Sequence, residues 1–124
     1  MRRATSIDVN QPKDRTHLTD LAVLYFKKEG YKVICENASM EGHSGVTRHF
    51  ELIVQKGRLE QGVWVRDWNR TVGVNLIIAL DTASEDVDLG SPIMIAEKFS
   101  DHAKSYSNRR KITLLTKQKI SSFM

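Results

Sequence analysis

The sequence has one cysteine and no long apolar run, and both absences narrow the classes of protein to which it can belong. A single cysteine, Cys35, cannot form an internal disulfide, and no cysteine or histidine spacing fits a zinc site. The longest apolar run, residues 72–80, is interrupted by Gly73 and Asn75 and is too short to span a membrane. The first fifteen residues contain no apolar stretch, so we expect no secretory signal. These absences predict a cytoplasmic protein with no membrane partner.

Acidic residues are absent from the last part of the chain. None follows Asp101, whereas the formal net charge of the whole sequence is +4. A cationic segment of this kind suits a polyanion such as nucleic acid, although the solvated surface of a basic protein explains it equally well. The residues of this segment that we expect to contact nucleic acid are Lys104, Arg109, Arg110 and Lys111.

The remaining composition is that of one globular domain. Hydrophobic residues make up 40% and charged residues 27% of 124 residues, which is ordinary for a chain that builds a single core. Residues 1–12 are polar and end in Gln11-Pro12, so we expect a flexible N-terminal arm before one domain at residues 13–124. The sequence has no internal repeats.

Hydrophobic periodicity predicts alternating helices and strands. Helical spacing of apolar residues begins near Leu18 and stops at Gly30. A strand at residues 31–35, a polar loop at 36–45 and two further strands follow. The remaining elements are a helix from 72 to 83, a strand at 91–96, a helix at 99–106, a strand at 111–115 and a short C-terminal helix. The strand–helix–strand succession requires crossover connections, which predicts an α/β fold with a central mixed sheet.

Two strand runs, HFELIVQ and GVWVRDWNRTVG, carry the polar groups best placed for chemistry. Strict alternation puts Phe50 and Leu52 on one face of the first run and Glu51 on the opposite face. The second run puts Trp64 and Arg66 on one face. A short polar loop joins the runs, so an antiparallel hairpin brings these two residues close to Glu51.

The order of several short patterns resembles a known family over nearly the whole chain. The patterns are Asp20 before Gly30-Tyr31, Ser44-Gly45 before Phe50-Glu51, the run Asp67-Trp68-Asn69-Arg70-Thr71-Val72-Gly73, Phe99-Ser100-Asp101-His102-Ala103 after a strand, and a last strand from Ile112 to Leu115. Together they resemble the Mrr-like restriction endonuclease domains of the PD-(D/E)XK nuclease superfamily. The resemblance implies a restriction-endonuclease-like three-layer sandwich and DNA as the partner.

The resemblance also implies where a metal-dependent nuclease centre would lie. Such centres hold Mg²⁺ or Mn²⁺ with oxygen ligands and place a lysine nearby. Here Glu51 takes the place of the first acidic ligand, Trp64 that of the second ligand and Arg66 that of the lysine. Tryptophan offers no oxygen, and arginine stays protonated and prefers to pair with a carboxylate. We therefore expect a degenerate centre, without a metal cofactor, in which Arg66 pairs with Glu51.

Two other interpretations stay open at this point. The first is an active endonuclease that uses Glu51 with Asp20 or Asp67, with His49 and Gln55 as further candidates for an unusual metal site. Asp67 alternates to the face opposite Glu51 and would join it only through a bulge. The second is a structural partner that forms a homodimer or a larger complex through the apolar helix at 72–83.

Two more arginines are candidates for contact with phosphate groups. Arg48 follows a glycine-rich loop that also contains His43 and Ser44. Trp68 and Arg70 flank the expected start of the second helix. There we expect Trp68 to pack against the helix and Arg70 to contact nucleic acid.

Overall fold

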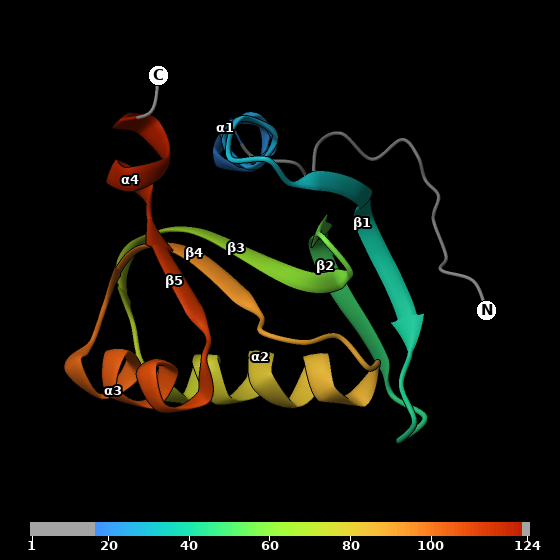
Figure 1. The fold of residues 1–124 in the computed structure, drawn as a ribbon. Helices are drawn as coiled ribbons and strands as arrows, with labels where there is room; N and C mark the ends of the chain where they lie inside the picture. The colour runs from blue at the N-terminus through green and yellow to red at the C-terminus, as the bar shows by residue number, and fades with distance from the viewer. Residues whose placement is uncertain (1–16, 123–124) are drawn as a thin grey trace.

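The computed structural model describes residues 17–122, and these form one mixed sheet between two layers of helices (Figure 1). The elements in chain order are α1 (His17–Lys28), β1 (Lys32–Glu41), β2 (Thr47–Lys56), β3 (Leu59–Val72), α2 (Val74–Asp86), β4 (Ile93–Phe99), α3 (Asp101–Arg110), β5 (Thr113–Thr116) and α4 (Lys117–Ser122). This succession is the predicted one, and the α/β three-layer architecture is confirmed.

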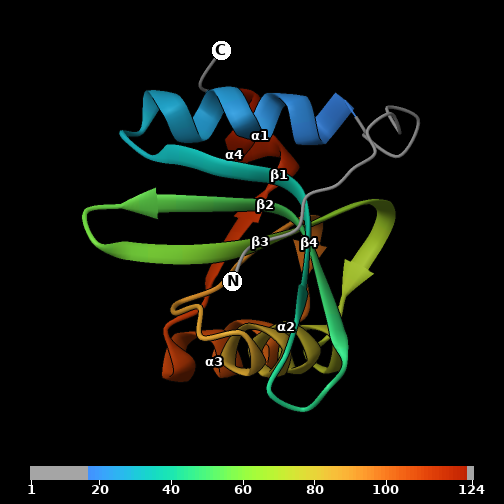
Figure 2. The same cartoon turned by 90° about the vertical axis from the view of Figure 1, so that its right-hand side faces the viewer.

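The sheet has the strand order β1-β2-β3-β4-β5. The first three strands are antiparallel neighbours, whereas β3, β4 and β5 are parallel. Parallel neighbours need crossover connections, and α2 and α3 provide them. Both crossover helices lie on one face of the sheet, while α1 and α4 cover the other face (Figure 2).

Each face of the sheet has its own apolar core. We call the face under α1 and α4 the first face; its core joins Phe26 of α1 and Ile120 of α4 to strand residues such as Val63. The second face lies against α2 and α3, where Ile77 and Leu80 pack on the strands. Because β3 and β4 are buried on both faces, their sequences contain consecutive apolar residues instead of strict alternation.

Several element boundaries differ from the sequence-based expectation. Residues 36–41 were expected in a loop but belong to β1, which pairs with β2 as far as Glu41 opposite Thr47. The polar composition misleads here because β1 is an edge strand whose outer half leaves Glu36 and Asn37 exposed. Strand β4 also continues to Phe99, so that residue ends a strand instead of starting a helix.

Strand β2 changes face near its middle, contrary to the expected alternation. Phe50 and Leu52 were expected on one face, but Leu52 packs on the first face and Phe50 belongs to the core of the second face. The outer half of the β1–β2 hairpin bends toward the layer of α2 (Figure 2), and this bend carries Phe50 across. Gly62 makes room for the ring, since a β-carbon there would lie 2.6 Å from it.

Helix α2 is buried on one side only. It begins at Val74, not at residue 72, and buries Ile77 and Leu80. Ala79 is exposed, and Ile78 is 40% exposed. An apolar side chain therefore remains on the outer surface of this helix, and its role in a homodimer stays a prediction.

Two other expectations concern the chain ends and membranes. The flexible arm expected at residues 1–12 lies outside the described residues. No helix within residues 17–122 is long and apolar enough to cross a membrane.

The carboxylate of Asp86 ties the tip of the β1–β2 hairpin to the end of α2. It accepts hydrogen bonds from the backbone N–H of Ser44 at 2.9 Å, from the Ser44 hydroxyl at 2.6 Å and from Nε of Arg48 at 2.8 Å. The Ser44 hydroxyl contributes most, followed by Arg48, to holding the pKa of Asp86 at about 2. Gly42 is needed beside it, because a β-carbon at this position would overlap the carboxylate.

We predict that Asp86→Asn destabilises the protein at neutral pH and that this difference shrinks in acid. A carboxyl group whose pKa falls on folding, here from 3.8 to about 2, stabilises the folded state above its unfolded-state pKa. That stability is lost as the pH falls through the folded-state value. Urea denaturation of both proteins between pH 7 and pH 2 measures the difference.

Asp88→Asn is the matched control, because the Asp88 carboxylate is 76% exposed and, among the described residues, pairs only with the exposed His43. Surface pairs of this kind contribute little, so we expect a small effect of this change at every pH. A difference between wild type and Asp86→Asn that is constant over the whole range contradicts the prediction.

Candidate functional site

The strands β2 and β3 separate at Glu51, and side chains continue the contact there. The backbone pairing of these strands ends at Leu52 opposite Val63. Beyond it, the Glu51 carboxylate accepts a hydrogen bond from the backbone N–H of Val65 at 3.0 Å. Trp64 donates from Nε1 to the carbonyl oxygen of His49 at 2.8 Å. Two side chain–backbone hydrogen bonds therefore replace the next backbone–backbone hydrogen bonds between β2 and β3.

Arg66 lies over this separation and pairs with Glu51, as expected. Its Nη1 is 3.5 Å from Oε1 of Glu51, which is longer than a charge-assisted hydrogen bond, so the attraction is mainly Coulombic. The same nitrogen donates to the carbonyl oxygen of Val65 at 3.1 Å. The guanidinium also stacks on the Trp64 ring, 4.7 Å from its centre. Carboxylate, guanidinium and indole thus form one cluster that is neutral in net charge.

The other carboxylates considered as metal ligands lie elsewhere. Asp20 is exposed in the first turn of α1, the helix that covers the first face. Asp67 bonds to Lys117 of α4 at 2.9 Å. Within residues 17–122, no group of three histidine, cysteine, aspartate or glutamate side chains is arranged to hold a metal ion.

Lys117 holds two carboxylates together at the ends of the parallel strands. Its Nζ lies 2.9 Å from Asp67 of β3 and 3.1 Å from Glu97 of β4. Hydrogen bonds to Asp67 and then to Glu97 raise the pKa of Lys117. The lysine thus occupies the position between these two carboxylates. The cluster was not expected from the sequence, because its three members are far apart along the chain.

A ladder of aromatic and cationic side chains extends from Arg66 along β3. Alternate residues of a strand share a face, so Trp64, Arg66, Trp68 and Arg70 follow one another. The Arg66 guanidinium lies 5.7 Å and that of Arg70 4.2 Å from the centre of the Trp68 ring. Trp68 is 36% exposed. The expectation that Trp68 packs at the start of the second helix is wrong, because β3 continues past it to Val72.

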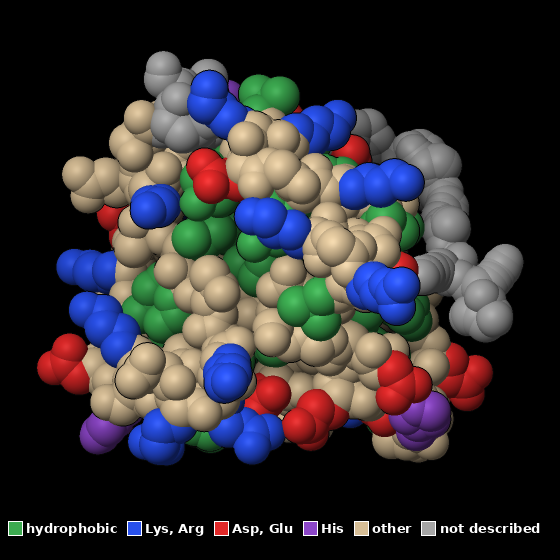
Figure 3. Space-filling model, viewed as in Figure 1, with side chains coloured by type: hydrophobic (Ala, Val, Ile, Leu, Met, Phe, Trp, Pro, Cys, Tyr) green, Lys and Arg blue, Asp and Glu red, His purple; other side chains and the backbone are tan. Residues whose placement is uncertain are grey.

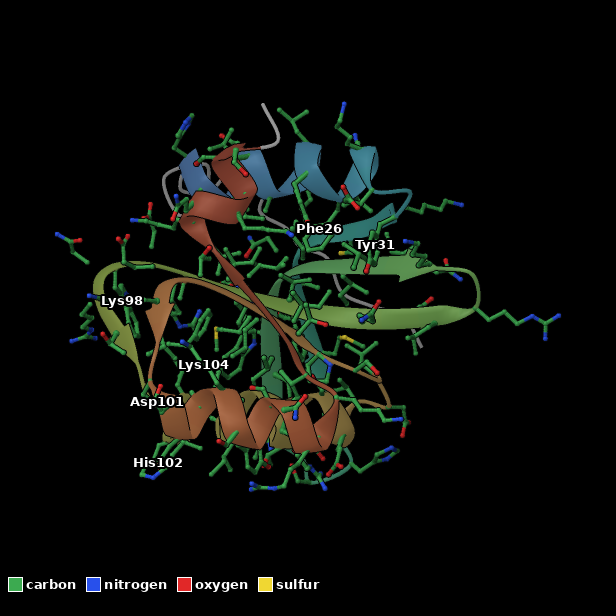
Figure 4. All side chains as sticks on the ribbon, turned by 60° about the vertical axis from the view of Figure 1, so that its left-hand side comes forward. Phe26, Tyr31, Lys98, Asp101, His102 and Lys104 are labelled. Carbon is green, nitrogen blue, oxygen red and sulfur yellow. The ribbon has the colours of Figure 1, made fainter. Side chains whose placement is uncertain are left out.

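Further basic side chains lie at this end of the molecule. Thr71 of β3 pairs with Lys98 of β4, so Lys98 is close to Arg70. Lys98 and Lys104 lie toward the same end of the structure, together with Asp101 (Figure 4). Sequence reasoning missed Lys98, although its place after the buried run of β4 marks a strand end. Together, Arg70, Lys98 and Lys104 form what we call the basic end.

The other predicted nucleic-acid contacts are distributed differently. Arg48 is bonded to Asp86, and Arg110 bonds to the buried Asp81 at 2.9 Å and to Glu85 at 3.1 Å. Basic side chains are therefore scattered among acidic ones on the face that Figure 3 shows. The charges of Arg48 and Arg110 are already balanced within the fold.

Arg109 and Lys111 lie at the end of α3 that is remote from the basic end. The Arg109 guanidinium is 5.9 Å from the centre of the Tyr106 ring. Lys111 terminates the helix in the left-handed conformation, with φ of 60°. It also lines an open pocket of 560 Å³ together with Lys56 and Tyr31. The predicted basic segment is thus divided between two regions of the surface.

We predict that Glu51→Ala destabilises the protein by about 1–3 kcal/mol, because the Val65 N–H and the Arg66 guanidinium both lose their acceptor. Glu51→Gln is the matched variant: its amide oxygen still accepts the Val65 N–H, so we expect a smaller loss. Chemical denaturation monitored by far-UV circular dichroism measures both. Equal losses would show that the hydrogen bond to Val65 contributes nothing beyond the ion pair.

Comparison with known proteins identifies similar folds. No protein-family model matches the chain, and no curated protein matches it significantly. The crystal structure of "Protein of Unknown Function AF1548" superposes with a TM-score of 0.71 at 14% identity, over 82% of this chain and 58% of the other. The structure of the EndoMS–dsDNA2 complex gives a TM-score of 0.50 at 9% identity, over 90% and 46%. The chain therefore spans about half the length of these proteins, with which it shares a fold.

Proposed function

We propose that this chain is a nucleic-acid-binding protein of the Mrr-like restriction-endonuclease type whose metal-dependent cleavage centre has degenerated. DNA is the proposed partner. The observation that carries the proposal is the engagement of Glu51 by the Val65 N–H at 3.0 Å and by Arg66 at 3.5 Å. This carboxylate is the first ligand position of the family that the sequence resembles, and protein groups already occupy it.

Cleavage chemistry has little support in the neighbouring side chains. A hard divalent cation requires several oxygen ligands, and it lowers the pKa of the attacking water. Trp64 offers only its indole ring, and its N–H is bonded to His49. Arg66 stays protonated at any physiological pH, so it cannot serve as a base. These groups suit binding of a phosphodiester without hydrolysis.

Basic side chains whose N–H groups are available to a ligand support the proposed binding of nucleic acid. Arg70 is held by stacking on Trp68, and no ion pair occupies its N–H groups within the described part of the chain. A stacked guanidinium keeps its edge available for a phosphate group. Lys98 and Lys104 add exposed charges nearby. The shared fold with a protein solved on double-stranded DNA is consistent with this partner.

We predict that fluorescently labelled DNA binds with strong dependence on salt, and that Arg70→Gln weakens binding several-fold at low salt. Loss of one phosphate contact reduces the slope of log K against log[salt] by about 0.9 for duplex and 0.7 for single-stranded DNA. Fluorescence anisotropy at several salt concentrations measures both quantities.

Arg58→Gln is the matched control for this measurement. Arg58 is an exposed arginine in the turn before β3, at the opposite end of that strand from Arg70. We expect its removal to leave the affinity and the salt slope nearly unchanged. No binding of any DNA at low ionic strength would overturn the proposal.

Retained cleavage is a separate outcome with its own measurement. We predict that supercoiled plasmid stays intact with Mg²⁺ or Mn²⁺. Nicking that requires the metal and disappears in Glu51→Gln would establish an active nuclease instead of a degenerate one.

A further inference from the structure

We propose that the segment Asp67–Arg70 of β3, here called the arch, is a stacking site for an unpaired base, so that the ligand is single-stranded nucleic acid. This inference rests on the proposed function and adds to it the class of ligand and the residue that recognises it. Trp68 supplies the stacking surface, and Arg70 supplies a cation for the adjoining phosphate.

In the part of the chain that the structure describes, the backbone of the arch pairs with no neighbouring strand on either side. Strand β3 has 14 residues, but its pairing with β2 covers only Leu59 to Val63. Its pairing with β4 runs to Arg66 and resumes at Thr71 after a shift in register. Within residues 17–122, the four residues between have no strand partner. In Figure 1 this part of β3 curves away from the centre of the sheet. The arch is therefore a backbone segment that protrudes from the sheet and takes no part in strand pairing.

Trp68 is an unusual side chain for such a position. The ring is 36% exposed, and two cations lie against it. The guanidinium groups of Arg66 and Arg70 are 5.7 and 4.2 Å from the ring centre. An exposed aromatic ring beside cations offers a surface on which a base can stack.

An unpaired base can replace Arg70 on the Trp68 ring. Stacking of a base on an aromatic side chain is stronger than a cation–π contact at an exposed site. The displaced guanidinium is then free to donate to the phosphate on the same nucleotide. Arg66 does not need to move, since Glu51 and Trp64 hold it, and it remains on the other side of the ring.

The charges on the side of the arch that carries Trp68 match this ligand. Lys98 lies on the neighbouring strand opposite Thr71, directly after the arch, and is exposed. The acidic residue of the arch, Asp67, alternates to the first face and shares Lys117 with Glu97, so these three side chains together carry one net negative charge on that face. The stacking face presents the Trp68 ring between two guanidinium groups, and aromatic rings beside cations are typical of surfaces that bind single strands. Bases inside a duplex are already stacked and cannot cover the ring.

The test compares a 12-nucleotide oligo-dT with a duplex of the same length by fluorescence anisotropy, for the wild type, Trp68→Phe and Trp68→Ala. We expect oligo-dT to bind more tightly than the duplex. Trp68→Ala should lose about tenfold in affinity for oligo-dT, with an unchanged salt slope because no charge is removed. Trp68→Phe should retain most of the affinity. Binding of the duplex should be nearly the same in all three proteins.

Intrinsic fluorescence provides an independent readout. The chain has two tryptophans, and Trp64 is partly buried, so a base stacked on Trp68 should quench the exposed one. We expect quenching by oligo-dT in the wild type and its loss in Trp68→Phe, which still binds. Thermal unfolding confirms that both variants fold.

The outcomes separate this inference from the proposed function. Equal binding of oligo-dT by the wild type and Trp68→Ala, or quenching that persists in Trp68→Phe, overturns the stacking site while nucleic-acid binding stands. Preference for the duplex overturns the ligand class. Failure of the wild type to bind either DNA overturns both proposals.

Discussion

The point at which β2 and β3 separate shapes the rest of the sheet, and side chains bridge the two strands there. The Glu51 carboxylate takes the place of a backbone acceptor for the Val65 N–H, so β2 can leave β3 without exposing a buried polar group. Because of this, the outer β1–β2 hairpin is free to bend and to carry Phe50 onto the second face. The same carboxylate fixes Arg66, which is the first cation of the ladder on β3. One acidic side chain thus connects the architecture of the sheet to the surface that we propose binds nucleic acid.

Element order and the central cluster follow from the sequence because they rest on local patterns. Alternation in β3 places Trp64 and Arg66 on one side, and the antiparallel hairpin brings Glu51 to them. The same rule fails at Phe50, since a period of two residues holds only while a strand stays straight. No local pattern reports where a strand bends. The bend becomes visible only through Gly62, whose missing side chain makes room for the ring.

The number of basic residues in the sequence does not predict which of them are available to bind a ligand. A count of basic residues does not reveal which of them are paired, and pairing partners here lie far along the chain. Arg48 is 38 residues from Asp86, and Arg110 is 29 residues from Asp81. Arg70, by contrast, is accompanied by an aromatic residue two positions away, a spacing that is visible in the sequence once the strand is known to continue. Local spacing therefore identified a better candidate than net charge did.

The replacement of a backbone acceptor by a side chain has a dynamic consequence. A rung made by two backbones opens only when the strands separate, whereas a carboxylate can release an amide by rotating about its own side-chain bonds. The Val65 amide should therefore exchange its hydrogen with solvent through small local openings, while Val63, one rung inside the ladder, remains protected. The separation of β2 and β3 thus leaves one amide in the middle of the sheet that can open locally, although Asp86 keeps the tip of the hairpin attached to α2.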